Sequence, residues 1–145
     1  MSNKTLMFLI MLMIAGVIFL LTLNTLPFLL SGKQIRHLDH QKVKGSYVLY
    51  AGKKYTLNYG QQIELIEGLN SAIPLGRSKF SPKDMPELGQ FVIEFFDDEP
   101  KLMLKPVGVI GNNLVFDIPS WNKEGWIKDV TDGKLLHLLE NSHPN

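Results

Sequence analysis

The densest group of titratable side chains is Asp97-Asp98-Glu99, which directly precedes a proline. Three carboxylates supply the oxygen ligands that Ca²⁺ or Mg²⁺ prefers. However, adjacent residues at a hairpin tip rarely converge on one ion, and the spacing is not that of an EF-hand loop. We expect a solvated turn whose charges discourage edge-to-edge strand pairing, with contact to a partner as the alternative. No metal is expected.

Two further groups of residues have types that suit catalysis or metal binding. His37 and His40 have a spacing that places both imidazoles on one helical face, but no third ligand is evident nearby. Glu94 and Asp117 are expected on adjacent strands, where a carboxylate pair would permit acid–base chemistry. The chain has no cysteine, no G-x-S-x-G motif and no glycine-rich phosphate loop. We therefore expect a protein that is not an enzyme and holds no cofactor.

Aromatic and basic residues form the most distinctive candidate for a binding surface. Trp121 and Trp126 stand close together in the sequence, and tryptophan is enriched at interaction hot spots. The other interpretation, in which one of them closes the core, stays open. A net charge of +1 does not favour nucleic acid as a partner. The residues expected to contact a protein partner are Trp121, Trp126, Arg77, Phe80, Asp97, Asp98 and Glu99.

The 25 residues from Leu6 to Leu30 contain no charge, and 16 of them are Leu, Ile, Val or Phe. A helix of this length spans about 37 Å, which exceeds the roughly 30 Å of the hydrocarbon core. A cleaved secretory signal is the alternative, but its apolar region is shorter, about 7–15 residues, and ends in a small-x-small site. We expect an uncleaved membrane anchor.

The side of the membrane follows from weaker signals. A very short amino-terminal tail with Lys4 before a long apolar run is typical of a bacterial signal-anchor. This favours an extracytoplasmic, periplasmic domain. The basic residues that follow the apolar run, Lys33, Arg36, Lys42 and Lys44, point the other way.

The remaining chain predicts a small α+β domain, an antiparallel sheet packed with one or two helices in the order ββ-α-βββ-α. Strands are expected at 47–51, 54–59, 91–96, 101–110 and 114–118, with helices at 61–72 and from Thr131 or Asp132 onward. The Gly52-Lys53 pair is expected to form the first hairpin turn. A bulge or an edge position is expected at Pro106. Residues 73–90 read as a long irregular loop, with a short strand around Leu75 to Phe80 as the alternative. A last short strand is considered at Trp126-Ile127.

The predicted organisation has five parts. These are a tail at 1–5, an anchor at 6–30, a juxtamembrane linker at 31–46, the soluble domain at 47–140 and a second tail at 141–145.

The function expected from this organisation is that of a single-pass membrane interaction module. It would bind another membrane or envelope protein, as a subunit of an envelope complex or as an inhibitor or immunity-type protein. The alternative is a small-ligand sensor in which the loop at 73–90 and the two tryptophans line a pocket. A hydrolase is a third interpretation. Gly16 is alone in the apolar segment, so no G-x-x-x-G motif predicts a homo-oligomer.

Overall fold

The computed structural model describes residues 2–30 and 37–144, with side chains in the first helix described through Leu23. The chain divides into two compact units, Met1–Gln34 and Ile35–Asn145. Each unit is considered by itself.

The first unit is the helix α1, Asn3–Leu30. Its portion Asn3–Leu23 is long and apolar enough to cross a membrane, a criterion that a signal sequence also satisfies. The hydroxyl group of Thr22 donates to the carbonyl oxygens of Ile18 (3.1 Å) and Phe19 (2.8 Å) of the same helix. This polar side chain is therefore satisfied within the helix, as an apolar solvent requires.

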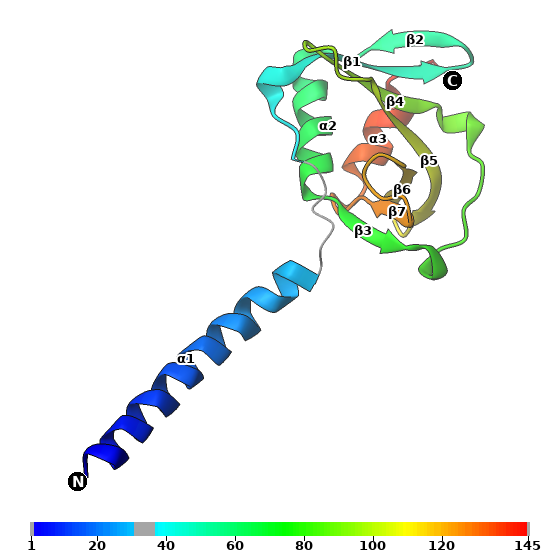
Figure 1. Ribbon diagram of the computed structural model, residues 1–145. Coiled ribbons are helices and arrows are strands. Elements are labelled where there is room, and N and C mark those ends of the chain that lie inside the picture. The colour runs from blue at the N-terminus through cyan, green and yellow to red at the C-terminus, as the bar shows by residue number, and fades with distance from the viewer. Residues whose placement is uncertain (1, 31–36, 145) are drawn as a thin grey trace. The chain divides into compact units, whose positions relative to one another are not determined.

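The second unit contains a seven-stranded sheet in the order β2-β1-β4-β5-β6-β7-β3, in which every pairing is antiparallel (Figure 1). Two helices, α2 (Tyr59–Ser71) and α3 (Lys134–Asn141), accompany the sheet. The predicted α+β class is confirmed. The strands are β1 (Val43–Tyr50), β2 (Lys53–Thr56), β3 (Ile73–Gly76), β4 (Gln90–Phe95), β5 (Leu102–Ile110), β6 (Asn113–Asp117) and β7 (Gly125–Lys128).

The centre of the sheet is the predicted meander from β4 to β6, extended by β7. The register between β5 and β6 shifts between Pro106 and Gly108, which confirms the bulge at this proline. The strand β3 lies in the segment that the sequence reads as an irregular loop. Its four residues are too few to show an alternation of polar and apolar side chains. They pair with β7, which lies about fifty residues later in the sequence. Local sequence patterns do not report such a pairing.

The folded unit begins earlier than the predicted strand start at Tyr47. Strand β1 starts at Val43, and Leu38 before it is only 3% exposed. The side chain of Asn70 on α2 holds Leu38 by accepting from its N–H (2.7 Å) and donating to its carbonyl oxygen (3.0 Å). This amide clamp explains why a polar segment is ordered against the domain.

The first hairpin turn is displaced by one residue from the prediction. Tyr50 pairs with Lys53, so the two turn residues are Ala51 and Gly52. Both have positive φ, 50° and 77°, which is the signature of a type I′ turn. The sequence favours Gly52 as the first turn residue because alanine seldom adopts a left-handed conformation. The register of the strands outweighs that local cost.

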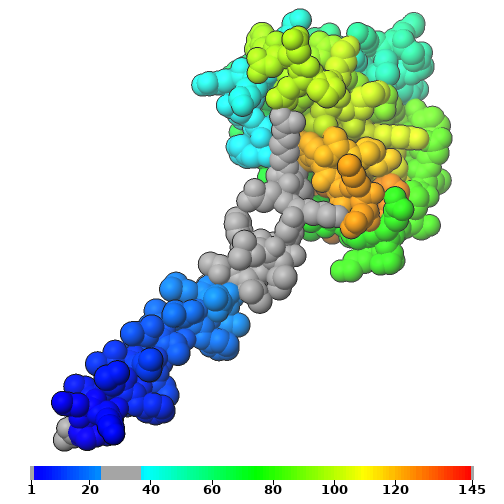
Figure 2. Space-filling view, in the orientation of Figure 1, coloured from blue at the N-terminus to red at the C-terminus, as the bar shows by residue number. Residues whose placement is uncertain are grey.

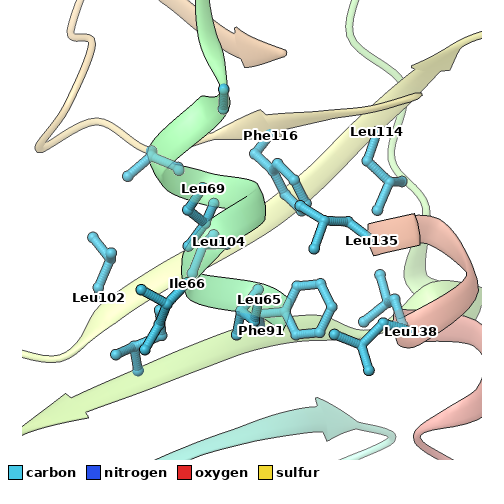
Figure 3. Close-up of a cluster of buried hydrophobic side chains, with 14 of the residues drawn as sticks. Leu65, Ile66, Leu69, Phe91, Leu102, Leu104, Leu114, Phe116, Leu135 and Leu138 are labelled. Carbon is cyan, nitrogen blue, oxygen red and sulfur yellow. The ribbon is translucent and has the colours of Figure 1, made fainter. Parts of the chain in front are cut away.

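The core lies between the sheet and the two helices. Leu65, Ile66 and Leu69 of α2 are fully buried and lie together with Phe91, Leu104 and Phe116 of the sheet (Figure 3). The capping box of Asn58 and Gln61 begins α2, each side chain accepting the other residue's N–H at 2.9 Å. Gly68 permits the close approach of α3, because a Cβ atom there would meet Leu135 at 2.9 Å.

The sequence favours Thr131 or Asp132 as the N-cap of the carboxyl-terminal helix, but neither occupies that position. Its N-cap residue is Gly133, at φ 94°. The hydroxyl of Thr131 instead accepts from the N–H of Leu135 at 3.4 Å. Beyond α3 the chain stays packed, since the ring of His143 stacks on Tyr50 with centroids 3.9 Å apart. Its Nε2 lies 3.1 Å from the carbonyl oxygen of Leu88. The part of the predicted tail that the structure describes, through residue 144, is thus tied to the first hairpin.

Candidate interaction surface

Two of the predicted partner-binding residues, Phe80 and Trp126, contact each other across the outer face of the sheet, the face opposite the helices. Their ring centroids are 6.4 Å apart in an edge-to-face arrangement. Phe80 covers Gly108, where any larger residue would collide with its ring. The Nε1 atom of Trp126 is buried and has no hydrogen-bond partner among the described residues. These rings hold the segment after β3 onto the sheet.

The neighbouring predicted residues, Arg77 and Trp121, also serve local packing. An Arg77 guanidinium nitrogen lies 3.4 Å from the carbonyl oxygen of Lys123. Trp121 is half-buried and packs against the core. The Nδ2 group of Asn122 donates to the carbonyl oxygen of Trp126 at 3.0 Å, which ties the two ends of this connection together. Contact of these residues with a partner stays a prediction.

The acidic turn is carried by a different part of the domain, the connection between β4 and β5. The N–H of Phe96, which precedes the turn, donates to the carbonyl oxygen of Lys42 at 3.1 Å. In Figure 2 the yellow-green atoms of the turn lie beside the cyan atoms of residues near 40. Asp97 and Asp98 are exposed, whereas Glu99 is half-buried. The turn therefore borders the start of the folded unit.

The expected carboxylate pair of Glu94 and Asp117 does not form on adjacent strands, because β5 lies between β4 and β6. Asp117 pairs in register with Lys105 of β5, and Glu94 instead bonds Lys101, which precedes β5. Within residues 2–30 and 37–144, no group of three His, Asp or Glu side chains is arranged to hold a metal ion.

An open area remains on the outer face over β1, β4 and β5. Tyr47, Val92 and Met103 form one row across these strands, since Val92 is in register with both neighbours. Met103 is 49% exposed, Tyr47 is half-buried and Val92 is covered between them. The surface is a short apolar and aromatic row on the face of the sheet opposite α2 and α3. We call it the outer row.

Lysine side chains frame the outer row. The ammonium nitrogens of Lys54 and Lys101 lie 4.8 Å and 6.0 Å from the centre of the Tyr47 ring, within the range of cation–π attraction. Lys101 also bonds a Glu94 carboxylate oxygen at 2.9 Å. This bond lowers the pKa of Glu94, with further lowering by the charges of Lys101, Lys54 and Lys44. Conversely, Glu94 raises the pKa of Lys101.

A cavity of about 280 Å³ adjoins the outer row and opens to solvent. Its walls are the hairpin turn at 51–52 and the segment 84–89, which crosses the outer face. Gly89 is required in this wall, because it has φ 74° and a Cβ atom would lie 2.7 Å from the carbonyl oxygen of Leu49. Lys105 lines the cavity and pairs with Asp84 at 3.5 Å. The other lining residues are Leu49, Ala51, Gly52, Met85, Pro86, Gly89, Gln90 and Pro106.

The sequence interpretation did not single out the outer row. It did consider a pocket lined by the loop at 73–90 and the two tryptophans; the cavity is lined by residues within 84–90 of that loop and by neither tryptophan. One signal was available, since Tyr47 alternates with Ser46 and Val48 in a strand and so occupies the face opposite the buried one. Recognising the row also required the pairing of β1 with β4, which local patterns do not report. No protein-family model, curated protein or solved structure matches the chain.

Proposed function

We propose that this chain is a single-pass, membrane-anchored interaction module that is not an enzyme and binds another membrane or envelope protein. The observation that carries the proposal is the outer row with its lysine frame and the adjoining open cavity. Apolar and aromatic centres surrounded by polar side chains are typical of protein interfaces. The partner would cover Tyr47 and Met103, and one of its side chains would enter the cavity.

The shape of the cavity favours a protein over a small ligand. Sites for small molecules typically enclose most of the ligand in about 300–1,000 Å³. The cavity described here is slightly smaller than that range and is open to solvent. It suits one side chain of a larger partner, while the outer row supplies further contact area. A small-ligand sensor remains the alternative function.

Anchoring by α1 would strengthen such binding, because a tether raises the effective concentration of a domain near membrane partners. We place the domain on the extracytoplasmic side. The natural chain has no cysteine, so a single Lys123→Cys substitution allows a direct test. A membrane-impermeant maleimide should label this variant in intact cells, and labelling only after lysis would contradict the placement.

The binding proposal is tested by placing a photo-crosslinking amino acid, p-benzoylphenylalanine, at Met103 in the full-length protein in its native membrane. Met103 is half-exposed at the centre of the proposed interface, so we expect a discrete protein adduct. The matched control carries the same amino acid at His137, an exposed position on α3. It should not yield that adduct.

Two further measurements separate the candidate functions. The double variant Lys54→Glu, Lys101→Glu should weaken the adduct at position 103, because it reverses both charges that lie near the Tyr47 ring. Absence of any discrete adduct, or equal adducts from Met103 and His137, would refute the proposed surface. If the crosslinker at position 103 forms an adduct with a small molecule and with no protein, the result would support the ligand-sensing alternative.

A further inference from the structure

We infer that the partner contributes an extended acidic segment, which pairs with the free edge of β2 as an additional strand of the sheet. This inference rests on the proposed function and specifies the chemistry of the partner. Strand addition at an open edge is an established mode of peptide recognition, in which main-chain hydrogen bonds provide the attachment.

The backbone of β2 has two residues directed away from the sheet. The N–H of Leu57 donates to the carbonyl oxygen of Ser46 at 3.0 Å. Hydrogen-bonded and non-bonded pairs alternate along an antiparallel ladder, so Tyr55 and Lys53 bond β1 in the same way. Lys54 and Thr56 therefore direct their N–H and C=O groups to the free edge. An added strand has four main-chain groups to bond.

The opposite edge of the sheet is less suited to accept a strand. It is formed by β3, which contains Pro74 opposite Ile127 of β7. Proline has no N–H to donate, and its presence on an edge strand discourages further pairing. In contrast, each residue of β2 retains its N–H. The two edges of the sheet are thus chemically distinct.

Charge selects the kind of segment that β2 accepts. Lys53 and Lys54 are both exposed on this strand. Lys54 is directed to the outer face, as its position over the Tyr47 ring shows, and Lys101 also lies over that ring. A second copy of β2 would bring lysines against lysines, which is unfavourable across strands. An acidic segment would instead place carboxylates beside the lysines that frame the outer row.

The inference is tested on the full-length protein in non-ionic detergent micelles with a synthetic, end-capped peptide of alternating threonine and glutamate. The readout is the backbone amide NMR spectrum with amide hydrogen exchange. We expect saturable shifts and slower exchange at Lys54 and Thr56. A peptide with lysine in place of glutamate should bind about tenfold more weakly, and added salt should reduce this difference.

A pair of variants at one position isolates the main-chain contribution. Thr56→Pro removes an outward N–H while leaving the β1–β2 hydrogen bonds intact, and should weaken peptide binding about fivefold. Thr56→Val retains the N–H and serves as the matched control. A further test uses the unaltered protein and two acidic peptides, N-methylated at alternate residues in the two possible patterns. The peptide whose methyl groups block the N–H groups that face β2 should lose binding, and the other peptide should keep it.

The outcomes distinguish this inference from the proposed function. Equal binding of the acidic and basic peptides would overturn the acidic character of the segment, and undiminished binding of both N-methylation patterns would overturn strand pairing. If a protein adduct at Met103 persists in that case, the proposed function stands and only the mode of pairing is wrong. If the adduct is also absent, both fail.

Discussion

Tyr47 shows how a single aromatic ring organises charge on this surface. Two lysine side chains approach its ring, and one of them also bonds Glu94. The charge of Lys54 also lowers the pKa of Glu94, so one carboxylate lies near two ammonium groups. As a result the surface keeps an excess of positive charge next to apolar groups, a combination that attracts acidic partners.

The ion pair of Lys101 and Glu94 leads to a prediction about acidity. Lys101→Met should raise the pKa of Glu94 toward its ordinary value of 4.5, because the bond to Lys101 is the largest cause that lowers it. Carbon-detected NMR titration of the Glu94 carboxyl group measures this change. Lys123→Met, which alters an exposed lysine outside this group, is the control and should leave the titration unchanged.

The direction of the accompanying stability change follows from the lowered pKa. The contribution of an ionised Glu94 is present above its ordinary pKa and is lost as the pH falls through the lowered value. The wild-type protein should therefore lose more stability than Lys101→Met on acidification through this range. Identical acid dependence of the two proteins would contradict the role of the pair.

Ala51 provides a second prediction at the level of one residue. Its positive φ in the type I′ turn is unfavourable for alanine, whereas asparagine is common at this position. Ala51→Asn should raise the free energy of unfolding by about 0.5–1 kcal/mol. Urea denaturation of the full chain in detergent measures the change. Ala51→Val, which is β-branched, should destabilise instead, and a stabilising valine would contradict the assigned turn.

The candidate site residues could be selected from the sequence by their types. The residues that each of them contacts in the fold could not be predicted. Trp126 and Phe80 are conspicuous in the sequence, and the structure brings them together over Gly108. Nothing in the local pattern separates an aromatic pair that fixes a loop from one that binds a partner. The burial that decides the matter depends on which strand lies beneath.

Elements with local signals were predictable. The second helix follows from the spacing of Leu65, Ile66 and Leu69, and the central meander follows from short connections between apolar runs. The bounds of β3, its pairing with β7 and the pairing of β1 with β4 were not predictable, because each depends on partners far away in the sequence. The ordered start at Leu38 was missed for the same reason, since its partner is Asn70.

The β3–β7 pairing carries a prediction at the level of elements. Gly125 is in register with Gly76. Of these two glycines, Gly125 is the one where an added Cβ atom would collide with a main-chain group, the carbonyl of Leu75. Gly125→Ala should cost about 1–3 kcal/mol and speed hydrogen exchange in β3. Gly76→Ala, where a Cβ atom would meet nothing within 4 Å, is the matched control. Equal effects of both changes would argue against the pairing.

At the scale of the whole molecule, the apolar helix and the folded unit favour different solvents. The side chains described in α1 are exposed throughout, which is costly in water for so many apolar groups. The second unit has its own core beneath a sheet. This division predicts that the helix, rather than the folded unit, holds the chain in a membrane.

The anchor prediction is tested by fractionation of cells. The full-length chain should stay in the membrane pellet after alkaline carbonate extraction, and its amino terminus should still include α1. Replacing residues 6–23 with an unrelated Leu/Ala segment of equal length should preserve this result. Arginines at Leu12 and Phe19 should release the chain, because each charge opposes insertion by about 2.5–3.5 kcal/mol. Recovery of a shortened soluble wild-type chain would show a cleaved signal instead.

The order of the strands also bears on how the protein is made. The sheet is complete only with the pairing of β7 and β3, and His143, which follows α3, packs against Tyr50. During synthesis, α1 emerges long before the residues that finish the fold. In the proposed membrane-anchored form, the apolar segment would therefore meet the bilayer while the domain is still unfolded, a state in which a polypeptide can be threaded through a translocation pore.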